Sequence, residues 1–217
     1  RQLADWIVAG DPAALAPVEA QTGIQLTRLG RVTLQSPGVL LKAPISGRLD
    51  AENGRAALEY VRLATMLCLG GGTDAMVTAP LNKEAVTLTG RAFTGHTEYI
   101  AELCGSPESW MLLVNDRLRV IHVTTHCALR LACEVDPARL LATLKMGHAT
   151  LGQLGLARRR MAVCGLNPHA GEHGLFGSEE TTSIGPAIAE ARGLGLDVHG
   201  PLPSDTLFLR ALRGEFD

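Results

Sequence analysis

Charged and aromatic side chains are scarce in this sequence of 217 residues. Charged residues make up 19% of the chain and aromatic residues 4%, and the formal net charge is -2. Basic residues nowhere form a long run, since the densest group is the arginines at 158–160, and this argues against a nucleic-acid-binding surface. With 46% hydrophobic residues, the composition is that of a folded α/β chain with a sizeable core and excludes intrinsic disorder.

Long hydrophobic runs are also missing. No stretch approaches the roughly 20 apolar residues that a membrane-spanning helix requires. No leader with basic, apolar and small-residue parts marks the sequence for export. We therefore expect a cytoplasmic protein without a membrane or nucleic-acid partner.

Cysteine is present, but its spacing suggests no pairs. The cysteines lack a Cys-x-x-Cys spacing and are odd in number, which predicts reduced thiols in the core rather than a disulfide framework or a zinc knuckle. Cys127 stands beside a histidine and is a candidate nucleophile, although neither a base nor an oxyanion site for it is apparent. The full set is Cys68, Cys104, Cys127, Cys133 and Cys164.

Three common signatures are absent, namely GxGxxG, GxxxxGK[ST] and GxSxG. A standard dinucleotide-binding fold, a P-loop enzyme and a hydrolase elbow are therefore not expected. The glycine-rich stretch LGGGTDA at 69–75 comes before a predicted strand rather than after it, so we interpret it as a helix stop.

Strand-like and helix-like patterns alternate through most of the chain. The spacing of apolar residues predicts helices at 12–23, 50–69, 82–90, 137–155 and 183–195. Runs of β-forming residues predict strands at 74–80, 111–116, 118–126, 161–166 and at the start of 197–208, where a proline-rich loop follows. This alternation predicts an α/β fold in which helices cover a mostly parallel sheet.

Polar residues follow four of these predicted strands. In chain order they are the LNK segment with Lys83, then His126, the Asn-Pro-His segment with His169, and the Pro-Ser-Asp segment with Asp205. Because open α/β sheets bind ligands beyond the carboxyl ends of their strands, the four ends predict one shared crevice.

His126 and His169 differ from the other histidines because each stands at or just past the end of an apolar strand. Imidazoles at two strand ends form a reasonable pair of metal ligands. Two ligands do not close a metal site, however, and two hydrogen-bonded polar residues are the simpler interpretation of the pattern alone. The histidines expected to be structural or to lie in loops are His122, His148, His173 and His199.

GHTE at 95–98 precedes a helical pattern. The glycine allows close approach of the backbone, and His96 and Thr97 can face an anion at the helix N-terminus. The alternative is an ordinary threonine cap with Glu98 in the first turn. Lys83 can likewise neutralise a phosphate or carboxylate, or it can simply be solvated.

Five ordered motifs together resemble the 4-hydroxythreonine-4-phosphate dehydrogenase family of pyridoxal phosphate biosynthesis. The motifs are TAPLNKEA (78–85), FTGHTEYIAE (93–102), VTTHCALR (123–130), GLNPHAGEHGLFGSEE (165–180) and GPLPSDTLF (200–208). The resemblance implies the isocitrate/isopropylmalate dehydrogenase type of fold, an α/β/α sandwich, in a homodimer. It also implies oxidation of 4-hydroxythreonine 4-phosphate by NAD or NADP with a divalent metal (Zn, Mg, Mn or Co), followed by decarboxylation.

The resemblance carries roles onto six residues of this sequence. It implies that His96 and Thr97 contact the substrate. His126 and His169 would ligate the metal. Lys83 would contact a phosphate or carboxylate, and Asp205 would lie near the metal and orient the substrate or a water, so both are implied catalytic residues.

The family also has segments that this sequence does not contain. Its members begin with a GDPAGIGPE-like loop, to which GDPAALAP at 10–17 is only superficially similar. They continue into a YHDQG segment whose histidine is the third metal ligand. The resemblance thus implies that residues 1–217 are the central part of a two-lobed enzyme, incomplete at both ends and inactive alone, in which the loop around Glu172 shapes the pocket.

Two alternatives stay open. Relatives within the family oxidise D-erythronate or D-threonate 4-phosphate, or act on cis-dihydrodiols, and LRVIHVTTH at 118–126 leans towards the sugar-acid group. The second alternative comes from a different functional class, in which the chain is a non-catalytic metal- or phosphate-binding module.

Overall fold

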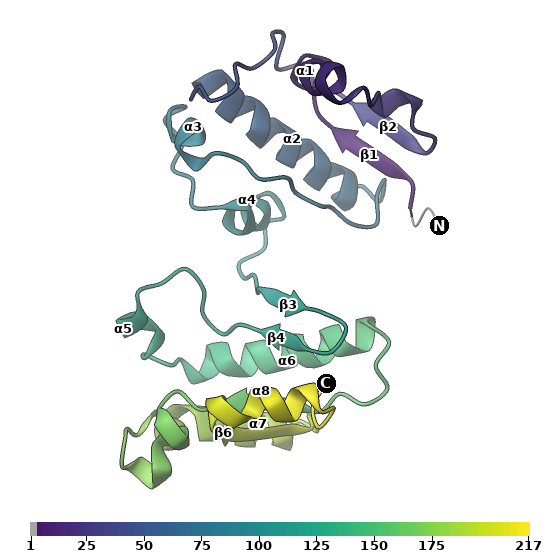
Figure 1. Ribbon diagram of the computed structural model, residues 1–217. Helices are drawn as coiled ribbons and strands as arrows, with labels where there is room; N and C mark the ends of the chain where they lie inside the picture. The colour runs from purple at the N-terminus through teal and green to yellow at the C-terminus, as the bar shows by residue number, and fades with distance from the viewer. Residues whose placement is uncertain (1–3) are drawn as a thin grey trace. The chain divides into compact units, whose positions relative to one another are not determined.

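The computed structural model describes residues 4–217. The chain divides into two compact units, Arg1–Ser109 and Trp110–Asp217 (Figure 1). Both mix helices with short strands, so the α/β class predicted from the sequence is confirmed. None of the helices in the described part of the chain is long and apolar enough to cross a membrane.

The first unit is built on one pair of parallel strands. Strands β1 (Trp6–Ala9) and β2 (Val32–Gln35) pair with Trp6 opposite Val32. Helix α1 (Pro12–Thr22) and the short turn η1 (Leu26–Arg28) connect the two strands. Pro12 at the helix start and Gly23 in the left-handed conformation at its end are the usual boundary signals.

Three further helices complete the first unit. They are α2 (Ala51–Leu69), α3 (Lys83–Thr87) and α4 (His96–Leu103). The side chain of Asp50 accepts a hydrogen bond from the backbone of Glu52 at 2.8 Å and thereby caps α2. The core formed by these helices contains Leu58, Val61, Val86 and Tyr99.

Gly54 sets the distance between α2 and α3. A Cβ atom at this position would lie 2.1 Å from the backbone oxygen of Ala85, which no real structure tolerates. The two helices therefore pack backbone against backbone, and this contact fixes the loop that leads to Lys83.

The second unit contains two separate strand pairs. Strands β3 (Leu112–Val114) and β4 (Arg119–Ile121) form an antiparallel hairpin, whereas β5 (Met161–Cys164) and β6 (Val198–Leu202) are parallel. The helices are α5 (Leu129–Ala132), α6 (Pro137–Gln153), α7 (Gly185–Gly193) and α8 (Ser204–Leu212), with the turn η2 (Pro168–Gly174) and the π-helical turn η3 (Glu180–Ile184). The buried core lies between α6, α7 and β6 and includes Leu140, Leu144, Ile184, Ile188 and Val198.

Most predicted elements are confirmed. The helices expected at 12–23, 50–69, 82–90, 137–155 and 183–195 are α1, α2, α3, α6 and α7, and the GGG at 70–72 ends α2. The strands expected at 111–116, 118–126, 161–166 and the start of 197–208 are β3, β4, β5 and β6.

Three expectations are wrong. Residues 74–80 form no strand, because no neighbouring segment pairs with them. Residues 204–212 form helix α8, where a proline-rich loop was expected. The predicted single parallel sheet is instead three two-stranded pairs among the described residues, so the idea of four strand ends on one sheet does not hold.

The cysteines are only partly as predicted. The structure pairs none of the five, but Cys104, Cys127 and Cys133 are exposed, and only Cys68 and Cys164 are half-buried. The expectation of core thiols is therefore wrong for three of them.

Candidate functional site

The ends of β5 and β6 bring two of the candidate segments together. Because the two strands are parallel, their carboxyl ends lie at the same edge. The segment with His169 follows β5, and α8 with Asp205 in its first turn follows β6. The hydroxyl of Ser204 donates a 2.8 Å hydrogen bond to the backbone oxygen of Gly165, which ties the start of α8 to the end of β5.

The turn that carries His169 has an unusual backbone. Residues 169–173 all have positive φ angles, from 40° at Glu172 to 79° at Gly171, and form a turn of left-handed helix. Residues other than glycine rarely adopt this conformation, and they do so mostly as single residues. A consecutive run of this kind must be held by its surroundings, and such strained segments gather at functional sites.

Two acidic residues, Glu179 and Glu180, hold the base of this turn. Glu180, which is 5% exposed, accepts hydrogen bonds from the backbone of Asn167 at 2.7 Å and from its side-chain amide at 2.8 Å. The same amide donates to Glu179 at 2.7 Å. Burial alone would raise the pKa of Glu180, but the hydrogen bonds from Asn167 outweigh it and leave that pKa below its usual value.

The second predicted metal ligand shares one backbone feature with His169. His126 follows β4, is exposed, and has a φ of 54°, close to the 53° of His169. Imidazole is a usual ligand of divalent transition metals, so both side chains stay predicted ligands. Among residues 4–217, no three His, Cys, Asp or Glu side chains gather closely enough to hold a metal ion by themselves.

The predicted substrate contacts lie in the first unit. His96 is the first residue of α4, and its ring meets Phe93 edge-on with the centroids 6.4 Å apart. The Nε2 atom of His96 is buried and has no hydrogen-bond partner within the described chain, so it suits a ligand group. The backbone of Gly95 before it is fully extended, with a φ of 174°, and Thr97 follows in the first turn.

Lys83 stands at the start of α3 and is exposed. Asn82 caps that helix by accepting a hydrogen bond from the backbone of Ala85 at 3.0 Å. A pocket of about 390 Å³ opens beside this helix, with Arg48, Asn53 and Asn82 among its polar lining residues. The two units thus divide the candidates, with Lys83, His96 and Thr97 in the first and the others in the second.

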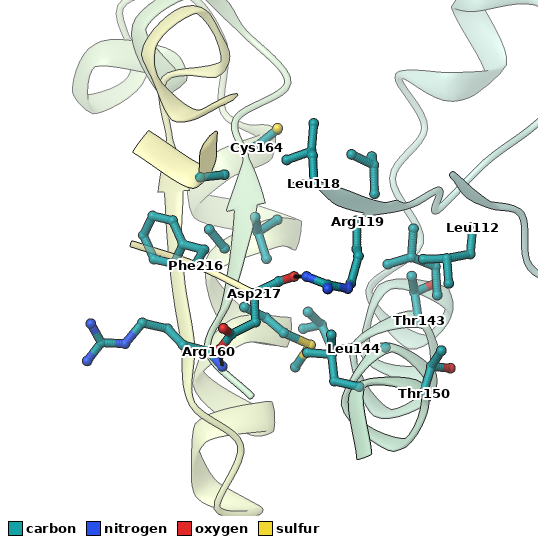
Figure 2. Close-up of a pocket in the computed structure, with 18 of the residues that line it drawn as sticks. Leu112, Leu118, Arg119, Thr143, Leu144, Thr150, Arg160, Cys164, Phe216 and Asp217 are labelled. Atoms are coloured by element: carbon teal, nitrogen blue, oxygen red, sulfur yellow. Dashed lines mark hydrogen bonds between the residues drawn. The ribbon is translucent and has the colours of Figure 1, made fainter. Parts of the chain in front are cut away.

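The second unit also has an apolar pocket, which is not the candidate site. It holds about 230 Å³ and lies between β4 and β5, which do not pair with each other. Figure 2 shows Leu112, Leu144 and Phe216 around it, together with Arg119, which donates a 3.0 Å hydrogen bond to the backbone oxygen of Asp217. None of the six candidate residues lines it, and most of its walls are apolar.

Glu180 is the functional candidate that reasoning from the sequence missed. It closes the motif GLNPHAGEHGLFGSEE, but periodicity gave no sign that it turns back towards Asn167, which is thirteen residues earlier. The signal in the sequence that could have identified Glu180 was an acidic pair after a glycine-rich loop. Such a pair more often marks a solvated helix start than a buried contact.

The left-handed turn at His169 and the buried, unpartnered Nε2 atom of His96 are features that often mark functional sites. Comparison with known families is specific: residues 2–217 match the family model described as pyridoxal phosphate biosynthetic protein PdxA. The chain belongs to the PdxA family, and the resemblance drawn from its motifs is confirmed.

The individual relatives are named as one of two enzymes. D-threonate 4-phosphate dehydrogenase of Cupriavidus necator is 45% identical over 212 residues, which are 97% of this chain and 63% of that protein. 4-Hydroxythreonine-4-phosphate dehydrogenase of Beijerinckia indica is 39% identical over 226 residues, covering 98% of this chain and 67% of that protein. The chain therefore spans roughly two thirds of the length of these relatives.

A solved structure agrees with the fold. The crystal structure of a 4-hydroxythreonine-4-phosphate dehydrogenase from Burkholderia phymatum matches with a TM-score of 0.83 and 41% identity. The match covers 97% of this chain and 68% of the solved one. The folds of both units are thus those of a PdxA-type dehydrogenase.

Proposed function

We propose that the protein is an NAD(P)-dependent dehydrogenase that oxidises the secondary hydroxyl of a 4-phosphorylated hydroxy acid. The observation that carries this proposal is 45% identity with D-threonate 4-phosphate dehydrogenase over 97% of the chain. That relative favours D-threonate 4-phosphate as the substrate over the 4-hydroxythreonine 4-phosphate that the motifs first implied. The 39% identical relative from Beijerinckia supports the second substrate.

The chain's own residues supply binding and proton chemistry in this reaction. His96 presents its unpartnered Nε2 to a polar group of the substrate, and Thr97 lies beside it in the first turn of α4. Lys83, exposed at the start of α3, neutralises the phosphate or carboxylate of the substrate. Asp205, in the first turn of α8, orients the substrate or a water molecule at the edge where β5 and β6 end.

His126 and His169 are the residues that would hold a divalent metal. A metal bound there would polarise the reacting oxygen as a Lewis acid and so ease loss of the hydroxyl proton. A bound nicotinamide would supply the hydride acceptor, and the oxidised product would be a β-keto acid that readily loses carbon dioxide. The remaining ligands would come from outside the described residues or from solvent.

We also propose the wider features that the family resemblance implies. The complete protein adopts the isocitrate/isopropylmalate dehydrogenase type of α/β/α sandwich, with two lobes of which residues 1–217 are the central part. It works as a homodimer in the cytoplasm. NAD(P) binds without a GxGxxG loop, in agreement with the absence of that motif.

The test is an assay of the full-length protein with D-threonate 4-phosphate and 4-hydroxythreonine 4-phosphate, each with NAD or NADP and with Mg²⁺, Mn²⁺, Co²⁺ or Zn²⁺. Metal-dependent reduction of the nicotinamide that is lost in both His126→Ala and His169→Ala supports the proposal. Metal binding without reduction of NAD or NADP by either substrate would refute it and identify a non-catalytic binding module.

A further inference from the structure

The left-handed turn after β5 has a backbone conformation that is unfavourable for most of its residues. The left-handed helical conformation is unfavourable for residues other than glycine, and His169, Ala170, Glu172 and His173 all adopt it. His169 is also exposed, so burial of its own ring does not hold the turn. Contacts at the base of the turn must therefore hold it in place.

Glu180 makes those contacts from inside the protein. One carboxylate oxygen accepts the backbone N–H of Asn167 at 2.7 Å, and the other accepts its side-chain amide at 2.8 Å. A Cβ atom on Gly171 would lie 2.7 Å from the second oxygen, and one on Gly165 would lie 3.3 Å from the first. The carboxylate is thus enclosed by the chain before the turn and by the turn itself.

The glycines show that this fit is tight. A Cβ atom on Gly165 would also approach Ala170 within 2.7 Å, so the turn folds back directly onto the end of β5. Gly171 is buried and has a φ of 79°. The turn therefore reaches Glu180 only because Gly171 within it and Gly165 at the end of β5 lack side chains.

We infer that Glu180 is the positioning residue for His169: by holding Asn167 and packing against Gly171, it fixes the left-handed turn that presents the imidazole at the carboxyl edge of β5. As a statement about metal binding, this rests on the proposed function. As a statement about the conformation of residues 168–174, it does not. Glu180 is buried beneath the turn, so it acts through His169 rather than on the substrate.

Glu180→Gln is the informative change because it keeps the shape of the side chain. An amide has one accepting oxygen, so its NH₂ group must face one of the two N–H donors of Asn167, and a buried donor loses its partner. Glu179→Gln is milder, since Glu179 accepts the side-chain amide of Asn167 but not its backbone N–H, and a glutamine oxygen can still accept that amide. Glu190→Gln, an exposed carboxylate on α7, is the matched control.

Zn²⁺ alone is the probe, titrated into the full-length protein by calorimetry. Removing a residue that orients a metal ligand typically weakens metal binding about 10–100-fold. We expect that loss for Glu180→Gln, a loss of about threefold or less for Glu179→Gln, and no change for Glu190→Gln. In parallel, amide hydrogen exchange of residues 168–174 should accelerate at least about tenfold in Glu180→Gln and stay at the wild-type rate in Glu190→Gln.

These outcomes separate the two claims. If Glu180→Gln keeps wild-type Zn²⁺ affinity and wild-type exchange of the turn, the positioning role is refuted. If the wild type binds no Zn²⁺, or His169→Ala binds it unchanged, the metal part of the proposed function fails, while the exchange rates still decide the role of Glu180. Should Glu180→Gln not fold, Asn167→Ala takes its place, because it removes the side-chain half of the same contact; unchanged exchange in that variant overturns the inference.

Discussion

Asp11 should be the most sensitive single position in the first unit. It is 1% exposed, and its carboxylate accepts backbone hydrogen bonds from Gly38 at 2.8 Å, Val39 at 3.0 Å and Leu40 at 2.7 Å. The hydroxyls of Ser36 and Tyr60 donate to it as well. One buried side chain thus organises the loop after β2 and ties it to the start of α1 and to α2.

Asp11→Asn is the perturbation that isolates the charge. One oxygen of the carboxylate accepts two of these donors and the other accepts three. A hydroxyl can turn and accept from an asparagine NH₂ group, but at least one backbone N–H is left facing a donor. Removing one member of a buried charged network costs about 3–5 kcal/mol, and we expect a loss near 3 kcal/mol because the exposed loop around Ser36 can relax. For a chain of this size, each kcal/mol lowers the Tm by roughly 2–4 °C.

The effect should depend on pH with a definite sign. Burial alone would raise the pKa of Asp11, but the hydrogen bonds from Ser36, Leu40, Gly38 and Tyr60 bring it below its usual value of 3.8. A carboxyl group whose pKa is lowered on folding stabilises the fold above its unfolded pKa and loses that contribution as pH falls through the folded one. The difference between wild type and Asp11→Asn should therefore be complete at pH 7 and shrink below about pH 4.

The assay is urea and thermal unfolding of the full-length protein at pH 7 and pH 3.5. Asp5→Asn is the control, because Asp5 forms an exposed ion pair with Arg31 in the same unit and exposed pairs contribute at most about 1 kcal/mol. The reasoning is refuted if Asp11→Asn costs no more than Asp5→Asn at pH 7, or if its cost is the same at both pH values.

Three further predictions follow from single contacts. Gly54→Ala should destabilise the first unit by about 3 kcal/mol in urea unfolding, since overpacking against the Ala85 backbone has no easy relief; Gly193→Ala, with open space around it, should change stability by less than about 1 kcal/mol. His96→Ala should lower kcat/KM of the full-length enzyme about 100-fold without changing its Tm; an unchanged kcat/KM would remove His96 from the site. Burial raises the pKa of the Cys164 thiol, so iodoacetamide should alkylate Cys127 before Cys164 at pH 8, and the reverse order would contradict the structure.

The elements predicted correctly are those whose signals are local. Helix α6 was predictable because Asp136 and Pro137 mark its start and apolar residues recur with helical spacing along it. The strand predicted at 74–80 was wrong because β-forming residues make a strand only when another segment pairs with them, and pairing is not a local property. Helix α8 was missed because Pro201 and Pro203, just before it, suggested a loop, although Asp205 in the first turn and the buried Leu207 are ordinary features of a helix.

The candidate site shows the same division between local and distant information. Histidines in the segments that follow β4 and β5 could be found from the sequence, since a polar residue after an apolar run is a local pattern. The left-handed backbone under His169 could not, because its local cost is unfavourable and a distant residue, Glu180, compensates for it. A sequence rule broken at a site usually has such a compensating contact elsewhere. It follows that the substitutions that most disturb the position of His169 need not lie beside it in the sequence. Substitution of Glu180, which is thirteen residues from its partner Asn167, should be among the most disturbing.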